Sequence, residues 1–221
     1  MGARNMRRRL LSGVIVAAGL TVWAAGLSAE TPGPRARDAL VDLLVWGADQ
    51  PLDLGAYSPE VKAELEKHLL RYKGYRSQRR RPVKAGALQL VHAAWVRYER
   101  KLVAVSGDPR APALAAAYVD SLRPCYEWEG FHACPEREAT FAAEYRTAHP
   151  GGPFSEYLPL LEAHRWLCTA GAYEYEQRPE DAARSRRVYE QTISTARHSK
   201  SLLVRLAAEG LTERGRCFTQ R

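Results

Sequence analysis

Apolar positions along most of the chain recur at the three- and four-residue spacing of an amphipathic α-helix. The first such segment spans residues 35–48, and a second follows Ser58-Pro59-Glu60. That tripeptide is a helix start, because the serine hydroxyl satisfies a backbone amide, proline fits the first helical position and the acid faces the positive end of the helix dipole. No segment alternates like a strand, and no Asn-Gly or Asp-Gly turn occurs. The pattern therefore predicts an all-α protein.

Breaker segments divide the rest of the chain into further helices. These segments are the basic run KGYRSQRRRP at 73–82, SGDP at 106–109, the cysteine-containing stretch 123–134 and HPGGP at 149–153. Helices are predicted at about 83–105, 112–122, 135–148, 156–177, 179–196 and 201–215. We expect seven or eight helices in all, arranged as an antiparallel bundle or as a short stack of helix pairs like that of tetratricopeptide repeats. The signature residues of that repeat do not occur at the right spacing here.

The N-terminus has the order of a secretory signal. Residues 1–9 contain four arginines and no acid, and residues 10–29 contain no charged residue. We expect 1–29 to be a signal peptide and 30–221 to be one helical domain, with a subdivision near 149–153 as the alternative. The mature protein would then be periplasmic or secreted. Because 10–29 also approaches the ~20 residues that span a bilayer, an inner-membrane anchor is the competing interpretation and the only membrane contact expected.

Charge and motifs exclude several classes of function. The chain carries 33 basic and 25 acidic residues, but removal of 1–29 leaves 29 basic residues and a net charge of +4. A charge of this size indicates solubility and not a nucleic-acid-binding surface. No phosphate-binding glycine loop, serine elbow or paired-histidine zinc motif occurs, so no catalytic residue and no cofactor is assigned.

Four cysteines, Cys125, Cys134, Cys168 and Cys217, lie downstream of the signal. In an oxidising compartment they predict two disulfides, and of the three connectivities proximity favours Cys125 with Cys134 and Cys168 with Cys217. Eight residues between the first two cysteines are too many for a redox-active pair at a helix N-terminus. Only His132 lies near Cys134, so no metal site is predicted.

The residues between the first two cysteines form the candidate binding surface. Aromatic and acidic residues alternate there, which suits a sugar, a peptide or a cationic partner. The surface comprises Tyr126, Glu127, Trp128, Glu129 and His132. The alternative, which we favour for the aromatic residues, is that they pack onto the helices while the acids face water.

Two other pairs have helical spacing. Glu64 and His68, with Glu60, would form a metal-binding strip or a set of solvated ion pairs. His164 and Cys168 would bring an imidazole to a thiol if Cys168 were reduced.

These observations lead to three hypotheses about function. The first is an exported, disulfide-stabilised binding or structural module of the bacterial envelope, whose partner is an envelope protein or a cell-wall polymer. The second is a small envelope hydrolase or metal-dependent enzyme that uses His132, His164, Glu127 and Glu162. The third, by analogy of architecture alone, is an inhibitor or immunity-type protein.

Overall fold

The structure is a computed structural model that describes residues 31–47, 52–84, 86–126 and 128–218. The predicted signal peptide, the competing anchor at 10–29 and Glu127 lie outside the described residues. Within the described part, the protein is all-helical, with eight α-helices and no strand. None of these helices is both long enough and apolar enough to cross a membrane.

The helices follow the predicted order closely. Their bounds are α1 Pro34–Trp46, α2 Pro59–Gly74, α3 Ala87–Ser106, α4 Ala111–Leu122, α5 Ala133–Ala148, α6 Leu158–Tyr175, α7 Pro179–Arg197 and α8 Leu202–Arg214, with a short 3₁₀ turn at Leu54–Ala56. The side chains of Ser58 and Ser201 cap α2 and α8 by accepting from backbone amides three residues ahead. Local capping chemistry therefore fixes where these two helices begin.

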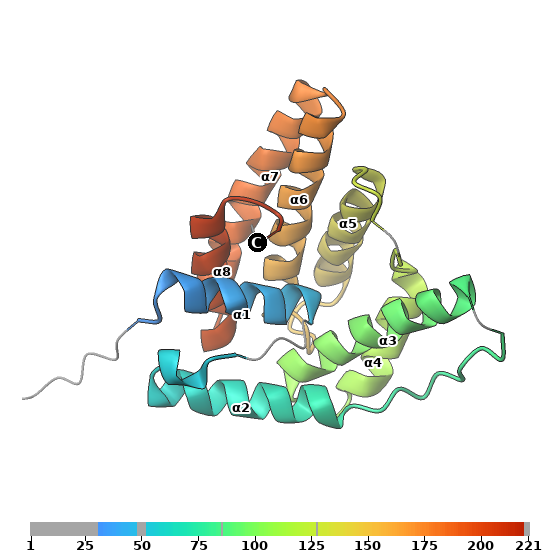
Figure 1. The fold of residues 1–221 in the computed structure, drawn as a ribbon, viewed down its shortest axis with the longest axis vertical. Helices are drawn as coiled ribbons and strands as arrows, with labels where there is room; N and C mark the ends of the chain where they lie inside the picture. The colour runs from blue at the N-terminus through green and yellow to red at the C-terminus, as the bar shows by residue number, and fades with distance from the viewer. Residues whose placement is uncertain (1–30, 48–51, 85, 127, 219–221) are drawn as a thin grey trace, which may run out of the picture.

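Consecutive helices from α5 to α8 pack against each other, and α1 packs across α8. In Figure 1, α5, α6 and α7 stand side by side, while α1 and α2 run across their lower end and α3 and α4 form a separate pair. The crossing of α1 and α8 is close at Gly210, where a Cβ would lie 2.7 Å from the backbone oxygen of Arg37. Only glycine fits this approach.

One buried hydrophobic cluster joins all eight helices. It includes Leu40 of α1, Leu102 of α3, Tyr118 of α4 and Leu161 of α6. The turn at 149–153 connects α5 and α6, which pack together, and the cluster draws residues from both sides of that turn.

The predicted start of α3 is wrong. The helix was predicted to begin at about residue 83, but Val83 is fully exposed and the helix begins only at Ala87. Gly86 has a φ of 94°, a conformation that breaks the helix one residue before Ala87.

The basic run between α2 and α3 is not simply a solvated linker. Glu99 of α3 is buried and accepts hydrogen bonds at 2.7 Å from the hydroxyls of Tyr75 and Ser77. The Arg79 guanidinium pairs with the same carboxylate and with Asp120 of α4, and it stacks on Trp95. Arg80 and Arg81 remain exposed. The run therefore ties α2 to α3 and α4 through its buried contacts.

His68 was expected on a solvated strip, but it is 1% exposed. Neither of its ring nitrogens has a hydrogen-bond partner among the described residues. Burial, and then the charge of Arg71, lowers the pKa of His68 from 6.5 to about 4. His68 is therefore neutral in the folded protein at neutral pH.

We expect acidification to destabilise the fold through His68. Between its unfolded pKa of 6.5 and its folded pKa of about 4, the unfolded chain binds a proton that the folded chain does not. The stability contributed by neutral His68 is therefore present above pH 6.5 and is lost as the pH falls toward 4. The loss is about 3 kcal/mol at pH 4.

Urea unfolding of the parent and of His68→Phe, at neutral pH and at about pH 4, measures this loss. Phenylalanine cannot be protonated and keeps a ring beside Tyr72. The variant should lose less stability than the parent between the two pH values. Equal losses would show that His68 is not responsible.

Candidate functional site

Both disulfides expected from proximity are present, and together they define the candidate site. Cys125 is joined to Cys134 and closes the loop between α4 and α5, residues 123–132, here called the cysteine loop. Cys168 of α6 is joined to Cys217 and holds the C-terminal segment that follows α8 against α6. The described residues contain no free cysteine. His164 and Cys168 therefore cannot act as a nucleophilic pair, because the sulfur is oxidised.

His132 anchors the end of the cysteine loop. Its backbone amide donates to Glu176 at 3.0 Å, and its ring Nδ1 lies 2.7 Å from the same carboxylate. These hydrogen bonds hold the pKa of Glu176 below its usual range. The His132 ring also stacks on Tyr173 of α6, with 4.3 Å between centroids. His132 is thus a positioning residue that fixes the loop against the end of α6.

The aromatic residues of the loop divide between the two predicted roles. Trp128 turns inward, 5.0 Å from the ring of Trp46 and 4.8 Å from the Arg165 guanidinium. Tyr126 and Phe131 are 46% and 56% exposed. Packing onto the helices is therefore correct for Trp128, while Tyr126 and Phe131 remain on the surface.

A groove of about 410 Å³ lies between the cysteine loop, α6 and the C-terminal segment. One side of the groove is made by residues of α6 at helical spacing, which are Cys168, Gly171, Ala172 and Tyr175. The loop contributes Trp128 to Phe131 and the C-terminal segment contributes Phe218. We call this surface the aromatic groove. Among its described lining residues, Glu129 alone is charged.

Small residues on α6 keep the groove open. A Cβ built on Gly171 would meet nothing within 4 Å, so packing does not require glycine there. Glycine inside a helix destabilises it by roughly 0.5–1 kcal/mol relative to alanine. Gly171 therefore lowers the stability of α6 for no reason that its packing explains, and it borders open space.

A buried ion pair contacts Trp128, one of the residues that line the groove. Arg165 of α6 and Glu138 of α5 are each 2% exposed, and Nε donates to the carboxylate at 2.7 Å. The Arg165 guanidinium lies against both Trp46 and Trp128, 4.7 and 4.8 Å from the centroids of their rings. Through these rings the ion pair determines where Trp128 sits.

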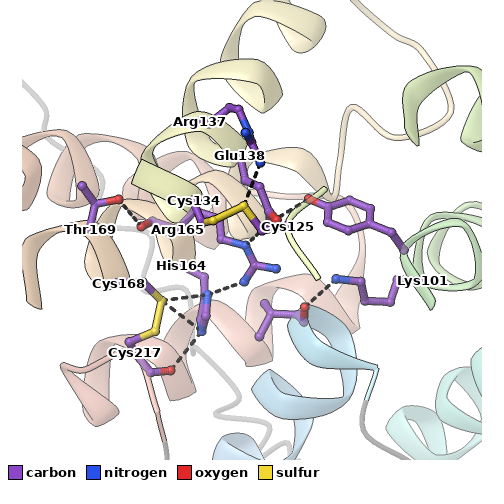
Figure 2. Close-up of polar contacts among 12 residues, drawn as sticks. Lys101, Cys125, Cys134, Arg137, Glu138, His164, Arg165, Cys168, Thr169 and Cys217 are labelled. Atoms are coloured by element: carbon purple, nitrogen blue, oxygen red, sulfur yellow. Dashed lines mark hydrogen bonds and ion pairs between the residues drawn. A yellow bond between two sulfur atoms is a disulfide. The ribbon is translucent and has the colours of Figure 1, made fainter. Parts of the chain in front are cut away.

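Next to the ion pair, His164 links α6 to the C-terminal segment. Burial, followed by the charges of Arg165 and Arg214, lowers the pKa of His164 well below its usual range. The ring is therefore neutral, with Nδ1 accepting from Arg165 at 2.9 Å and Nε2 donating to the Cys217 carbonyl at 3.0 Å. Figure 2 shows this chain of contacts from Glu138 to Cys217.

The metal-ligating alternatives find no support in the geometry. His164, Cys168 and Cys217 place ligand atoms within 4.8 Å of one another, but both sulfurs belong to one disulfide and provide no thiolate. Glu60, Glu64 and His68 line one cavity of about 290 Å³. Among the described residues, their ligand atoms do not come together as a set of three.

The residues named for an enzyme lie in separate networks. His132 binds Glu176, His164 binds Arg165 and the Cys217 carbonyl, and Glu162 binds Arg146 and Thr192. Glu127 falls outside the described residues. No two of the three described side chains share a hydrogen-bond partner, so these contacts do not join them in one network.

The structure adds residues to the groove that the sequence did not single out. They are Gly171 and Tyr175 of α6, and Phe218 after α8, which stacks on Trp46 at 5.4 Å. The one available signal was the CTAGA stretch of α6, where small residues interrupt a buried helix.

Three comparisons with known proteins returned no match: none was found among protein families, curated proteins or solved structures.

Proposed function

We propose that the chain is a binding module of the bacterial envelope. Its aromatic groove binds apolar side chains of a protein partner. The observation that carries the proposal is the exposure of aromatic rings around one groove. Phe131, Phe218 and Tyr175 are 56%, 58% and 80% exposed, and all three line it. Apolar surface gathered in this way is typical of an interaction site, whereas single exposed apolar residues are ordinary.

The lining favours a protein over a cell-wall polymer as the partner. A sugar needs many hydrogen-bonding groups around it, but the groove is made mainly of aromatic rings, a proline and small residues. Glu129 at the rim would attract a lysine or arginine next to the bound apolar side chain. We therefore expect a peptide segment with one or two large apolar residues beside a basic residue.

Both disulfides hold residues of the groove in place, so the groove is preorganised for binding. Cys168 and Cys217 line it directly, and the Cys125–Cys134 bond closes the loop that forms the opposite side. A rigid surface loses little conformational entropy on binding. Paired cysteines also support export to an oxidising compartment.

Selection from a peptide library against the folded protein tests the proposal. We expect enriched peptides to contain a large apolar residue next to a basic one. Gly171→Trp should bind them at least about tenfold more weakly, because the indole would occupy the groove, and its Cβ meets no protein atom within 4 Å.

Two variants control for effects on folding. Gly171→Ala changes the same position but leaves the groove open, so it should bind like the parent and be more stable by roughly 0.5–1 kcal/mol. Ala117→Trp places the same large residue on an exposed position of α4. Peptides that bind Gly171→Trp as well as the parent would show that the groove is not the binding site.

A further inference from the structure

Another cavity, of about 180 Å³, shares Trp128 with the aromatic groove. Its lining includes Arg97 and Lys101 of α3, Glu138 of α5 and Arg165 of α6. Aromatic rings of Trp46, Tyr98, Tyr126 and Trp128 complete the wall. Its exposed members are Arg97 and Tyr126, which places the opening beside them. We call it the cationic cavity.

The charges of this cavity do not balance. Three cationic side chains face one carboxylate, and Glu138 is already bound to Arg165 at 2.7 Å. Lys101 is 4% exposed, and burial followed by the charge of Arg165 lowers the pKa of its ammonium well below the usual range, although Glu138 opposes this. Buried charge without a counter-charge is unfavourable. The cavity therefore holds basic groups that no described carboxylate pairs with, and an anion beside Lys101 would favour its charged form.

Hydrogen-bond donors remain free at the same place. The ammonium of Lys101 donates to the Val45 carbonyl at 2.8 Å and lies 4.1 Å from the centroid of the Tyr98 ring, so one conventional hydrogen bond uses one of its three donors. Arg97 is exposed and forms no hydrogen bond or ion pair with any other residue that the structure describes. Figure 2 shows Lys101, Glu138 and Arg165 converging from three helices.

We propose that the cationic cavity binds a small oxyanion, a carboxylate or a phosphate, between Lys101 and Arg97. The anion would pair with the two basic groups and accept hydrogen bonds from donors that the fold leaves unused. The four aromatic rings favour a carboxylate with a flat apolar body, such as an aromatic acid. This site is distinct from the aromatic groove, and Trp128 is the wall that the two share.

Titration of the folded protein with benzoate and with inorganic phosphate tests the proposal, with the indole N–H signals of Trp46 and Trp128 followed by NMR. We expect saturable binding, with benzoate tighter than phosphate. If phosphate binds more tightly than benzoate, the cavity is still an oxyanion site, but its ligand is a phosphate and not an aromatic acid. The affinity should fall as salt is added, because the attraction is electrostatic.

Variants locate the site without disturbing the buried ion pair. Arg97→Ala removes an exposed side chain and should weaken benzoate about fivefold or more without changing the melting temperature. Ala94→Leu adds bulk to the cavity wall and should weaken binding further. Arg187→Ala removes an exposed arginine from α7 and should have no effect.

Two results would overturn the proposal. One is the absence of saturable binding of either anion at concentrations up to about 10 mM, a range in which even a millimolar complex saturates. The other is equal weakening by Arg97→Ala and Arg187→Ala, which would show general attraction to a basic surface. Neither result bears on peptide binding in the aromatic groove, which Gly171→Trp tests separately.

Discussion

Glu138→Ala is expected to lower the free energy of unfolding by about 3–5 kcal/mol, because it leaves the Arg165 charge buried and unpaired. Arg165 cannot relieve the cost by losing its proton, since a guanidinium stays charged in proteins. Glu138 also lies 3.4 Å from the hydroxyl of Tyr98, so a second contact is lost. Urea unfolding followed by circular dichroism measures the change.

Two variants show whether the effect comes from the unpaired charge. Glu138→Leu combined with Arg165→Met removes both charges and should recover most of the loss, because a buried ion pair adds little over apolar packing. Glu174→Ala breaks the pair with Arg186 on the surface, where both side chains are about half exposed, and should change stability by less than about 1 kcal/mol. If the double variant is as unstable as Glu138→Ala, the loss reflects packing and the electrostatic explanation is wrong.

Replacing Cys168 and Cys217 together with alanine should lower the free energy of unfolding by about 4 kcal/mol, whereas the same change at Cys125 and Cys134 should lower it by about 3 kcal/mol. The difference follows from the length of chain that each bond closes, with sequence separations of 49 and 9. The first variant also releases the segment that places Phe218 on Trp46.

Thermal unfolding of the two double variants compares these losses directly. Reducing agent should likewise lower the melting temperature of the parent while leaving its circular dichroism helical. An intact mass that rises by four hydrogens on reduction confirms that both bonds were present at the start. An unchanged melting curve after complete reduction would contradict a stabilising role for the disulfides.

The sequence predicted the helices well where local chemistry sets their ends. Ser58 caps α2 as expected, and Ser201 caps α8 at the predicted start of that helix, because a hydroxyl at the N-cap satisfies a nearby backbone amide of its own helix without help from distant residues. Proximity in sequence also paired the cysteines correctly. The start of α3 was missed because an apolar pattern can continue upstream of Gly86, whose backbone conformation ends the helix.

The site was only partly predictable, because its parts meet through tertiary packing. The cysteine loop suggested Trp128 and Glu129, which do line the groove. Phe218 is 90 residues further on than Trp128, and its segment reaches α6 through the Cys168–Cys217 bond and the contact of His164 with the Cys217 carbonyl. His68 was misread because helical spacing shows which residues share a face but not which face is buried.

The most direct measurement is an NMR chemical-shift map of the folded protein bound to a peptide enriched in the library selection. Binding in the aromatic groove predicts shifts in the amide signals of Gly130, Gly171 and Phe218, which come from its three sides. The same titration of Gly171→Trp should leave the amide signals of Gly130 and Phe218 unshifted. Shifts confined to other surfaces, such as α2 or α7, would show that the groove is not where the protein binds its partner.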